Sequence, residues 1–374
     1  MHQTDRTWAK IHLDRLAHNY QTLRAHTAPD CHFLAPVKAN AYGHGAVAVS
    51  RHLQGLGCDY LAVATLPEAL ELRAAGITLP ILIFGYTNPE DASILTEHDL
   101  TQAIFSLDQA RALSHALSGT GGTLRVHLEL DTGMGRLGFP ASSEQLEDAR
   151  RTMTLPHLDT QGVFTHFSVA DTAEGDEYTT EQLAAFSRAV CWLEAETGRE
   201  IPLCHATNSG GVLRLPSTHL NMIRPGIALY GLPPFPAELQ PVMELKTRVI
   251  QVRPFADGES VSYGRTYQAR AGQTIAVVPM GYADGLHRVL SGKMDMLLHG
   301  QRVSQVGRIC MDFSMLDVTQ VSKKISIGDT VTVFGTDGDE TVSVAEQAAL
   351  AGTISYELLC SVSPRVPRVY LNGG

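Results

Sequence analysis

The sequence predicts an α/β protein of two domains, an N-terminal (β/α)8 TIM-type barrel followed by a mainly antiparallel β domain. Its 374 residues exceed the length of one ordinary domain and fit two. Continuous apolar runs alternate with helical stretches from residue 32 to 230, whereas apolar and polar residues alternate singly further on. We therefore expect the barrel over residues 10–238 and the β domain over residues 239–374.

Eight apolar runs support the barrel. Continuous runs are typical of parallel strands that are buried on both faces, and eight such strands close a barrel. An open doubly wound sheet remains the alternative. The runs are HFLAPVK (32–38), YLAVA (60–64), PILIFG (80–85), TQAIFS (101–106), LRVHLELD (124–131), QGVFTHF (161–167), PLCHAT (202–207) and LNMIRPG (220–226).

The pattern changes after LYGLPPFPAEL (229–239), whose three prolines are typical of a linker. Residues 244–255, 273–285, 294–318 and 328–335 alternate with a period of two and carry Gly and Asp at turns. This alternation predicts antiparallel strands with one solvated face.

Composition excludes several classes of protein. The net charge of -10, without any Lys/Arg-rich run, disfavours nucleic-acid binding. No apolar leader and no membrane-spanning stretch is visible, and six cysteines without a CxxC pair indicate reduced thiols. We expect a cytoplasmic protein. The 16 histidines form no HxH or HExxH pattern, so we expect no metal site.

Polar and ionisable side chains collect where the predicted strands end. The carboxyl ends of barrel strands surround the active site in this fold class, so these residues are candidates for catalysis. A lysine at a strand end can simply reach into water, but it can also be a reactive amine. The residues are Lys38, Arg136, His166, Asn208, Ser209 and Arg224.

The chemistry of these groups suits pyridoxal phosphate. A lysine amine forms Schiff bases with carbonyls, and this cofactor is the commonest such partner. Arg224 and Gly226 of IRPGIALYG, with Ser209 of ATNSG, offer groups for its ring nitrogen and phosphate. Each signal is weak alone, because a serine at a helix start is usually only an N-cap. Gly43 and Gly45 allow a tight turn after Lys38, and we interpret His44 as structural.

Nine ordered motifs resemble those of bacterial alanine racemase. They run across nearly the whole chain, from about residue 7 to 370. The resemblance implies a homodimer with pyridoxal phosphate on the barrel lysine, and residues 1–9 adding a strand to the β domain. The motifs are VKANAYGHG, DTGMGRLGF, THFSVAD, HATNSG, NMIRPGIALYG, VSYGRTY, GYADG, GRICMD and SPRVPRVY.

The resemblance assigns residues to the cofactor. Lys38 carries it, and Arg224 faces the pyridine nitrogen. Because an arginine does not give up its proton at working pH, that nitrogen stays unprotonated. The other implied cofactor contacts are Tyr42, His166, Asn208, Ser209, Gly226, Ile227 and Tyr356.

The resemblance also implies one base on each face of the substrate. Lys38 covers one face, and Tyr263 of VSYGRTY covers the other from the second subunit. A phenol with a pKa of about 10 needs help to act as a base near neutrality. His166, with Arg224 and His205 behind it, supplies that support. Without the motif, Tyr263 would be interpreted as a strand tyrosine with its hydroxyl at the surface.

Four further residues are implied to bind the substrate. Arg136 lies near the carboxylate, the Met311 backbone N–H contacts it across the dimer, Asp312 follows in the same CMD motif, and Tyr282 lines the entrance. Taken alone, Met311 is equally compatible with core packing and ADG with a β-turn.

One position departs from the family pattern. Many members carry a carbamylated lysine two residues before DTGMGR, where this chain has Glu129. On a strand, Glu129 shares a face with His127 and Asp131. We hypothesise that its carboxylate replaces the carbamate as the ionic partner of Arg136. The alternative is a solvent-facing glutamate.

The sequence thus predicts a pyridoxal phosphate-dependent isomerase that interconverts L- and D-alanine and supplies D-alanine for peptidoglycan. A racemase of serine or another small amino acid is a second reading, since one hydroxyl is discriminated only modestly by a pocket. A non-catalytic pyridoxal phosphate-binding protein is a third, disfavoured by VSYGRTY and CMD. Arg224 disfavours a decarboxylase.

Overall fold

The chain, seen here in a computed structural model, is described over residues 6–119, 121–233, 235 and 237–372. Its packing divides it into two compact units. The barrel unit comprises residues 17–41 and 46–240, and the β unit comprises residues 1–16, 42–45 and 241–374. Residues 1–5 of the expected N-terminal strand lie outside the described residues.

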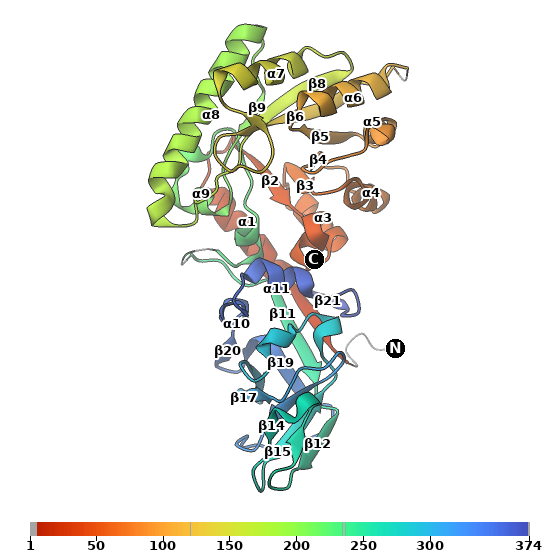
Figure 1. Cartoon of the computed structure of the whole chain (residues 1–374), viewed down its shortest axis with the longest axis vertical. Coiled ribbons are helices and arrows are strands. Elements are labelled where there is room, and N and C mark those ends of the chain that lie inside the picture. Colours follow the sequence, from red (N-terminus) through yellow and green to blue (C-terminus); the bar gives the residue numbers. More distant parts are fainter. Residues whose placement is uncertain (1–5, 120, 234, 236, 373–374) are drawn as a thin grey trace. The chain divides into compact units, whose positions relative to one another are not determined.

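Parallel strands form the centre of the barrel unit. Within the described residues, eight follow in the order β10–β2–β3–β4–β5–β6–β8–β9, and a short β7 (Phe139–Pro140) pairs with the end of β6. Helices lie outside this nearly closed sheet (Figure 1). The predicted (β/α)8 class is confirmed. The strands are β2 (His32–Pro36), β3 (Tyr60–Val63), β4 (Ile81–Ile83), β5 (Leu100–Ile104), β6 (Leu124–Asp131), β8 (Leu158–Phe164), β9 (Leu203–His205) and β10 (Met222–Ile223).

Helices follow these strands along the chain. The first of them, α1 (Leu13–Ala25), follows the strand β1 of the β unit. The others are α3 (Ala46–Gly55), α4 (Leu66–Ala74), α5 (Ala92–Glu97), α6 (Leu107–Leu117), α7 (Ser143–Met153), α8 (Asp176–Thr197) and α9 (Ser209–Arg214), with 3-10 turns η1 (Pro89–Asp91), η2 (Ala173–Gly175), η3 (Pro216–Thr218) and η4 (Ile227–Tyr230).

Apolar side chains from seven of the strands form one buried cluster of the barrel unit. Such burial on the inner face, together with helices outside, explains why the strands read as continuous apolar runs. The cluster consists of Leu34, Ala62, Leu82, Ala103, Phe164, Leu203 and Met222.

The chain leaves β2 through an unusual turn, α2 (Lys38–Tyr42). Four successive non-glycine residues, Ala39 to Tyr42, have φ between 52° and 54°. A left-handed conformation costs roughly 1–2 kcal/mol per residue for L-amino acids, so surrounding contacts must hold it. The residues KANAY did not allow this left-handed turn to be predicted from the sequence.

Gly43 and Gly45, at φ of 82° and 102°, complete this segment within the β unit. A Cβ on Gly43 would lie 2.2 Å from the Leu359 carbonyl oxygen, and one on Gly45 would lie 1.9 Å from the Tyr370 hydroxyl. Both glycines therefore serve close packing as well as the tight turn that the sequence predicted.

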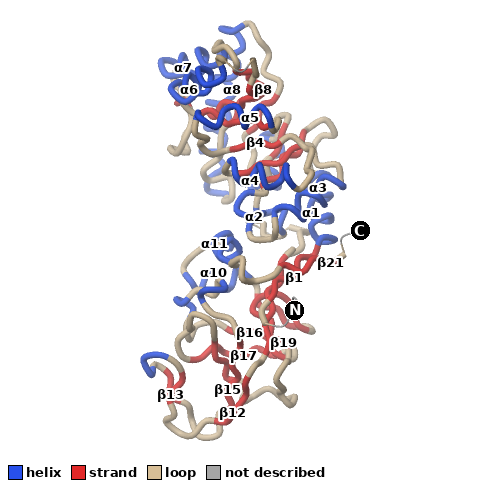
Figure 2. The backbone as a smooth tube through the Cα atoms, turned by 90° about the vertical axis from the view of Figure 1, so that its right-hand side faces the viewer, coloured by secondary structure: helices blue, strands red, loops and turns tan. Residues whose placement is uncertain are grey.

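The β unit is a mainly antiparallel sheet, as predicted (Figure 2). Its strands lie in the order β12–β15–β18–β17–β16–β19–β11–β1–β21, and β1 pairs with β11 antiparallel and with β21 parallel. The strands are β1 (Trp8–His12), β11 (Met243–Arg248), β12 (Gln251–Pro254), β15 (Thr274–Val278), β16 (Asp295–Leu298), β17 (Gln301–Val306), β18 (Ser314–Asp317), β19 (Thr330–Asp337) and β21 (Arg368–Leu371), with β20 (Glu340–Val342) paired to β19.

Shorter elements complete the β unit. A separate pair, β13 and β14, surrounds the turn η5, and two helices precede β21. These elements are β13 (Ser260–Val261), η5 (Tyr263–Arg265), β14 (Tyr267–Gln268), η6 (Tyr282–Asp284), η7 (Arg288–Leu290), α10 (Val344–Ala351) and α11 (Ser355–Ser361). Across the part of the chain that the structure describes, no helix combines the length and apolar character needed to span a bilayer.

A buried ion pair joins strands of the β unit. Lys246 Nζ lies 2.9 Å from the Glu244 carboxylate and donates hydrogen bonds of 2.9 Å to Thr332 Oγ1 and to the Thr336 carbonyl. Burial alone raises the pKa of Glu244, but hydrogen bonds from His12 and Lys246 lower it to about 2. The folded state therefore prefers the ionised carboxylate.

We expect Glu244→Gln to destabilise the β unit by about 3 kcal/mol at pH 7, because it leaves the Lys246 ammonium buried without its counterion. The contribution of Glu244 is complete above its unfolded pKa, which is about 4.3, and disappears as the pH falls through the folded value. Urea unfolding, followed by the fluorescence of Trp8 in a Trp192→Phe background, measures both effects.

The exposed Asp339 of the same unit is the control. Asp339→Asn should change the free energy of unfolding by no more than about 0.5 kcal/mol, as is typical of substitutions at the surface. The double variant Glu244→Gln/Lys246→Met should recover most of the loss. Equal stability of Glu244→Gln and wild type across pH 2–7 would contradict the assignment.

Candidate active site

Lys38 lies two residues beyond the last residue of β2, at the carboxyl end of the barrel sheet. Its side chain is half-buried, and its charge acts on His166 and Glu129 inside the barrel unit. The predicted run ended at Lys38, whereas the strand ends at Pro36, because the left-handed turn begins at once. That turn places the ammonium group at the end of the barrel.

Arg224 is the central cation of the barrel end, and its side chain is only 5% exposed. It follows β10, and its Nη2 donates to the carbonyls of Thr165 at 2.6 Å and Ala206 at 3.0 Å. Its Nη1 lies 2.7 Å from His205 Nδ1, and its Nη2 lies 3.4 Å from His166 Nδ1. Burial lowers the pKa of Arg224 to about 10, so the guanidinium stays charged near neutrality.

These contacts define the tautomers of the neighbouring histidines. Because Arg224 only donates, His205 Nδ1 must accept, and its Nε2 must carry a proton. That proton points to His127 Nδ1, 2.8 Å away. Burial, followed by the charge of Arg224, lowers the pKa of His127 and of His166 to about 3 and that of His205 well below its ordinary value. All three imidazoles are therefore neutral.

His127 was not predicted as a site residue. Its position two residues before Glu129 on β6 was the available signal, because alternate residues of a strand share a face. A histidine in an apolar strand is, however, also common as a satisfied core residue. Only the register of β6, β8 and β9 brings it against His205.

The starts of α9 and η4 lie together. Asn208 Oδ1 accepts the Gly211 N–H at 3.2 Å and thereby caps α9. Ser209 Oγ accepts the Ala228 N–H at 3.2 Å, which ties α9 to the turn that follows Gly226. Backbone N–H groups of two helical turns thus gather at one edge of the barrel unit, as an anion-binding group requires.

Glu129 is buried on β6, whereas Arg136 is exposed on the following loop. Among the described contacts there is no hydrogen bond or ion pair within 4.0 Å between them. Burial raises the pKa of Glu129, and the charges of Arg136, Arg224 and Lys38 act against that rise. The link between Glu129 and Arg136 in this structure is electrostatic at longer range, instead of the direct pair that we hypothesised.

Asp131 organises the loop that carries Arg136. Its carboxylate accepts the N–H of Gly133 at 2.9 Å and of Gly135 at 3.1 Å. The two glycines adopt φ of 134° and 68°, which explains why the motif DTGMGR has glycine at both positions.

The β unit carries the remaining predicted residues. Tyr263 is 67% exposed and begins η5, between Ser262 at φ 66° and Gly264 at φ 72°. Ser262 Oγ donates to the Arg308 carbonyl at 2.6 Å and fixes the turn. Tyr263 therefore presents its phenol on a rigid, strained turn and not on a strand.

GYADG and CMD are adjacent in space. The Tyr282 N–H donates to the Cys310 carbonyl at 3.0 Å, and the Ala283 N–H donates to the Met311 carbonyl at 3.0 Å. A Cβ on Gly281 would lie 2.3 Å from both of these carbonyl oxygens, so the two loops meet only because residue 281 is glycine. Tyr282 and Met311 are both exposed.

A second set of ion pairs holds these loops, and the sequence did not reveal it. Asp284, fully buried, receives Arg6 Nη1 at 2.5 Å and Nη2 at 2.8 Å. Arg365 lies 3.7 Å from Asp284 and 2.8 Å from Asp312. Asp312 therefore serves the packing of its own unit in this structure.

Tyr42 and Tyr356 lie near each other in the β unit, with ring centroids 5.9 Å apart. Tyr42 is buried and Tyr356 is exposed. Burial raises the pKa of Tyr42, so its hydroxyl remains a hydrogen-bond donor at all working pH values.

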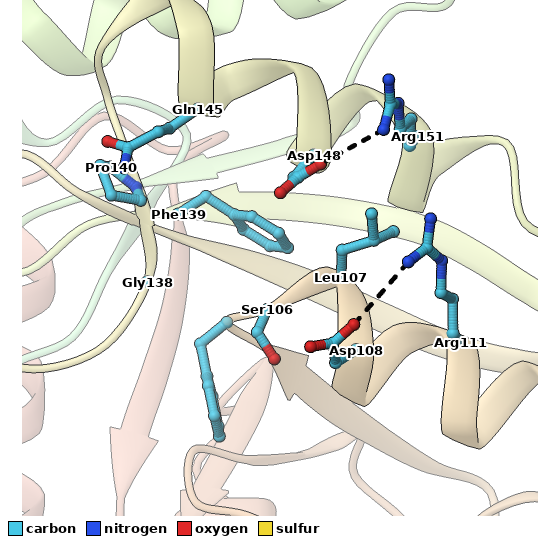
Figure 3. A pocket seen from close by; sticks show the side chains of 11 residues that line it. Ser106, Leu107, Asp108, Arg111, Gly138, Phe139, Pro140, Gln145, Asp148 and Arg151 are labelled. Atoms are coloured by element: carbon cyan, nitrogen blue, oxygen red, sulfur yellow. Dashed lines mark ion pairs between the residues drawn. The ribbon is translucent and has the colours of Figure 1, made fainter.

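A surface pocket of about 310 Å³ lies elsewhere on the barrel unit (Figure 3). Ion pairs of 3.7 Å between Asp108 and Arg111 and of 3.8 Å between Asp148 and Arg151 lie at its edge. Exposed pairs of this kind contribute little, and none of the predicted site residues lines the pocket. It contributes nothing to the candidate site.

Comparison with known proteins identifies the protein family. Residues 11–234 match the alanine racemase N-terminal domain, and residues 242–370 match the alanine racemase C-terminal domain. The chain is 44% identical over 373 residues to "Alanine racemase" of Methanococcus maripaludis, and the match covers 98% of each chain. It is 43% identical to that of Desulfosudis oleivorans, over 98% of this chain and 97% of the relative.

Solved structures agree with these matches. Alanine racemase of Clostridium difficile 630 superposes with a TM-score of 0.92 at 37% identity, covering 98% of this chain and 96% of that one. The Bacillus anthracis alanine racemase with bound L-Ala-P gives a TM-score of 0.93 at 35% identity, covering 98% and 95%. Both domains and nearly the full length match, so this chain belongs to the alanine racemase family of enzymes.

Proposed function

We propose that this chain interconverts L- and D-alanine with pyridoxal 5'-phosphate, that Lys38 and Tyr263 of the partner subunit act as the two bases, and that D-alanine then serves peptidoglycan synthesis. One observation at the barrel end carries the proposal. The charges of Lys38 and of the buried Arg224 both act on His166, which is neutral and contacts Arg224. Residues 10–238 and 239–374 are the proposed functional domains.

The groups at the barrel end suit the cofactor. A half-buried amine at Lys38, a donor-only guanidinium at Arg224 and the N–H groups around Ser209 match its carbonyl, ring nitrogen and phosphate. When bound, pyridoxal phosphate would withdraw electrons from the substrate α-carbon and ease removal of its proton. Further proposed contacts are Tyr42, His166, Asn208, Gly226, Ile227 and Tyr356.

Arg224 controls how far electrons are withdrawn. Two backbone carbonyls and His205 hold its N–H groups in a defined direction, so it would donate to the ring nitrogen without transferring a proton. The unprotonated ring is the weaker electron acceptor, which favours return of the proton to the same carbon. His205 and His127 are the residues that orient Arg224.

Racemisation needs a proton to leave from one face and to arrive on the other. Lys38 Nζ would exchange it on one face and the Tyr263 phenol on the opposite face. The exposed phenol of Tyr263 supports its delivery to a second subunit, because it is free to enter a site outside its own fold. His166 is neutral and its Nδ1 accepts from Arg224, so its Nε2 carries the proton and would donate a hydrogen bond to the oxygen of that phenol.

The remaining proposed contacts bind the substrate carboxylate. Arg136 supplies a cation, and Glu129 balances the positive charge of the barrel end from within β6. From the partner subunit, the loops with Tyr282, Met311 and Asp312 would close the site. Their fixed geometry in the β unit supports this role.

Tyr263→Phe should abolish proton removal from one face only. When L-alanine is the substrate supplied, we expect the exchange of its α-proton with deuterium from solvent to slow by about 100-fold or more, because general base catalysis commonly contributes that much. When D-alanine is supplied, the exchange should continue. Tyr267→Phe, in the same segment, is the control. Undiminished exchange into both isomers would refute the role of Tyr263, and the same assay with serine measures substrate preference.

Lys38→Ala should lose the absorbance band of lysine-bound cofactor, because no other amine at the barrel end replaces its side chain. Lys293→Ala, at an exposed lysine of the β unit, should retain it. The measurement is a spectrum of the dialysed protein after addition of pyridoxal phosphate. A wild-type band in Lys38→Ala would show that the cofactor is bound elsewhere.

Mixing the Tyr263→Phe and Lys38→Ala variants tests whether each active site takes its two bases from different subunits. In a heterodimer, one site would pair Lys38 of the Tyr263→Phe subunit with Tyr263 of the Lys38→Ala subunit. Random association of a symmetric dimer should restore about a quarter of wild-type activity. Light scattering verifies the dimer. If both bases came from one chain, mixing would restore none.

A further inference from the structure

Glu68 makes an unusual set of contacts beside Lys38. Its Oε1 accepts the Ala39 N–H at 2.7 Å, and its Oε2 accepts the N–H groups of Ala64 at 2.8 Å and Thr65 at 3.2 Å. All of these residues belong to the barrel unit. Hydrogen bonds to a carboxylate are roughly twice as strong as those between neutral groups.

The contacts on Oε2 are those of an ordinary helix cap. Thr65 is the N-cap of α4, and Glu68 is the third helical residue, which reaches back to the N-cap N–H. The contact on Oε1 has no part in that motif, because Ala39 is 29 positions away in the chain. It therefore needs a separate explanation.

The peptide that Oε1 holds is the one directly after Lys38. The Ala39 N–H and the Lys38 carbonyl belong to the same planar unit, so fixing the N–H direction fixes ψ of Lys38. The direction of the Lys38 Cα–Cβ bond follows from that angle. A carboxylate on α4 thus aims the lysine side chain.

This hold is needed because the turn is strained. Ala39, Asn40 and Ala41 have φ of 52°, 54° and 52°. The bonds that support them include those from Ala46 N–H to Asn40 Oδ1 at 2.8 Å and from Ala41 N–H to the Val37 carbonyl at 2.8 Å. Neither restrains the Ala39 N–H.

Glu68 also joins the ends of two neighbouring barrel strands. β2 and β3 are paired as far as Pro36 and Ala62, and the Val37 N–H donates to the Ala62 carbonyl at 2.8 Å. Beyond that point the strands separate into different turns. There the Glu68 carboxylate accepts one N–H from the β2 side and two from the β3 side, and so continues the connection.

We propose that Glu68 is a positioning residue that holds the left-handed turn after Lys38 and so aims the lysine amine. This inference rests on the proposed function, in which Lys38 carries the cofactor and moves the proton. The contacts of Glu68 described above are to backbone N–H groups, so it would act on the amine through the backbone of Lys38.

Glu68→Ala tests the proposal, with Glu71→Ala on the exposed side of α4 as the matched control. We expect kcat of holoenzyme to fall about tenfold or more with KM nearly unchanged, because a misplaced reacting group slows the chemical step. Glu68→Gln keeps an acceptor oxygen and should restore part of the loss. It also serves if Glu68→Ala folds poorly.

Amide hydrogen exchange gives a second readout that does not depend on activity. The Ala39 N–H should exchange about tenfold faster or more in Glu68→Ala, since its acceptor is removed, and should not change in Glu71→Ala. Unchanged Ala39 exchange, or equal kcat in the Glu68 and Glu71 variants, would overturn the proposal and leave Glu68 as a helix cap. An inactive wild type would refute the proposed function alone, because faster Ala39 exchange would still support the hold on the turn.

Discussion

The buried Arg224 guanidinium is the interaction on which the candidate site depends. A permanent cation inside a protein must be surrounded by acceptors, and here they come from the ends of β8 and β9. The Phe164 ring, 5.4 Å from the guanidinium carbon, and His205, stacked on that ring, complete the enclosure. Satisfying one arginine thus aligns the last strands of the barrel.

The same cation determines the state of its neighbours. Burial together with Arg224 keeps His127, His166 and His205 neutral, so these groups orient and bond without adding charge. Glu129 is the carboxylate on which the charges of Lys38, Arg136 and Arg224 act together.

Precision at the barrel end comes from strained backbone that is held from outside. The turn after Lys38 would be unfavourable in isolation, and the Glu68 carboxylate, the Asn40 side chain and a backbone bond to Val37 are among the contacts that hold it. In the β unit, Tyr263 likewise begins a turn between two residues of positive φ. Both proposed bases therefore stand on backbone that few sequences adopt by themselves.

The sequence by itself determined the alternation of strands and helices, the change to period-two patterning and the polar residues at the strand ends. Those features are local, because burial on one or both faces imposes its own periodicity on each segment. The ordered motifs pointed to the same chemistry. The remaining site residues, including Glu129, were candidates whose contacts no single segment specifies.

Only the tertiary structure decided how these residues meet. His127 and Glu68 carried no strong local signal, and the pairing of neighbouring strands brings each to a partner far away in the chain. It also replaced the expected Glu129–Arg136 pair with a longer-range interaction. The left-handed turn at Lys38 was likewise invisible, because alanine and tyrosine rarely adopt that conformation, a single asparagine does not predict four successive residues in it, and contacts from outside must offset the strain.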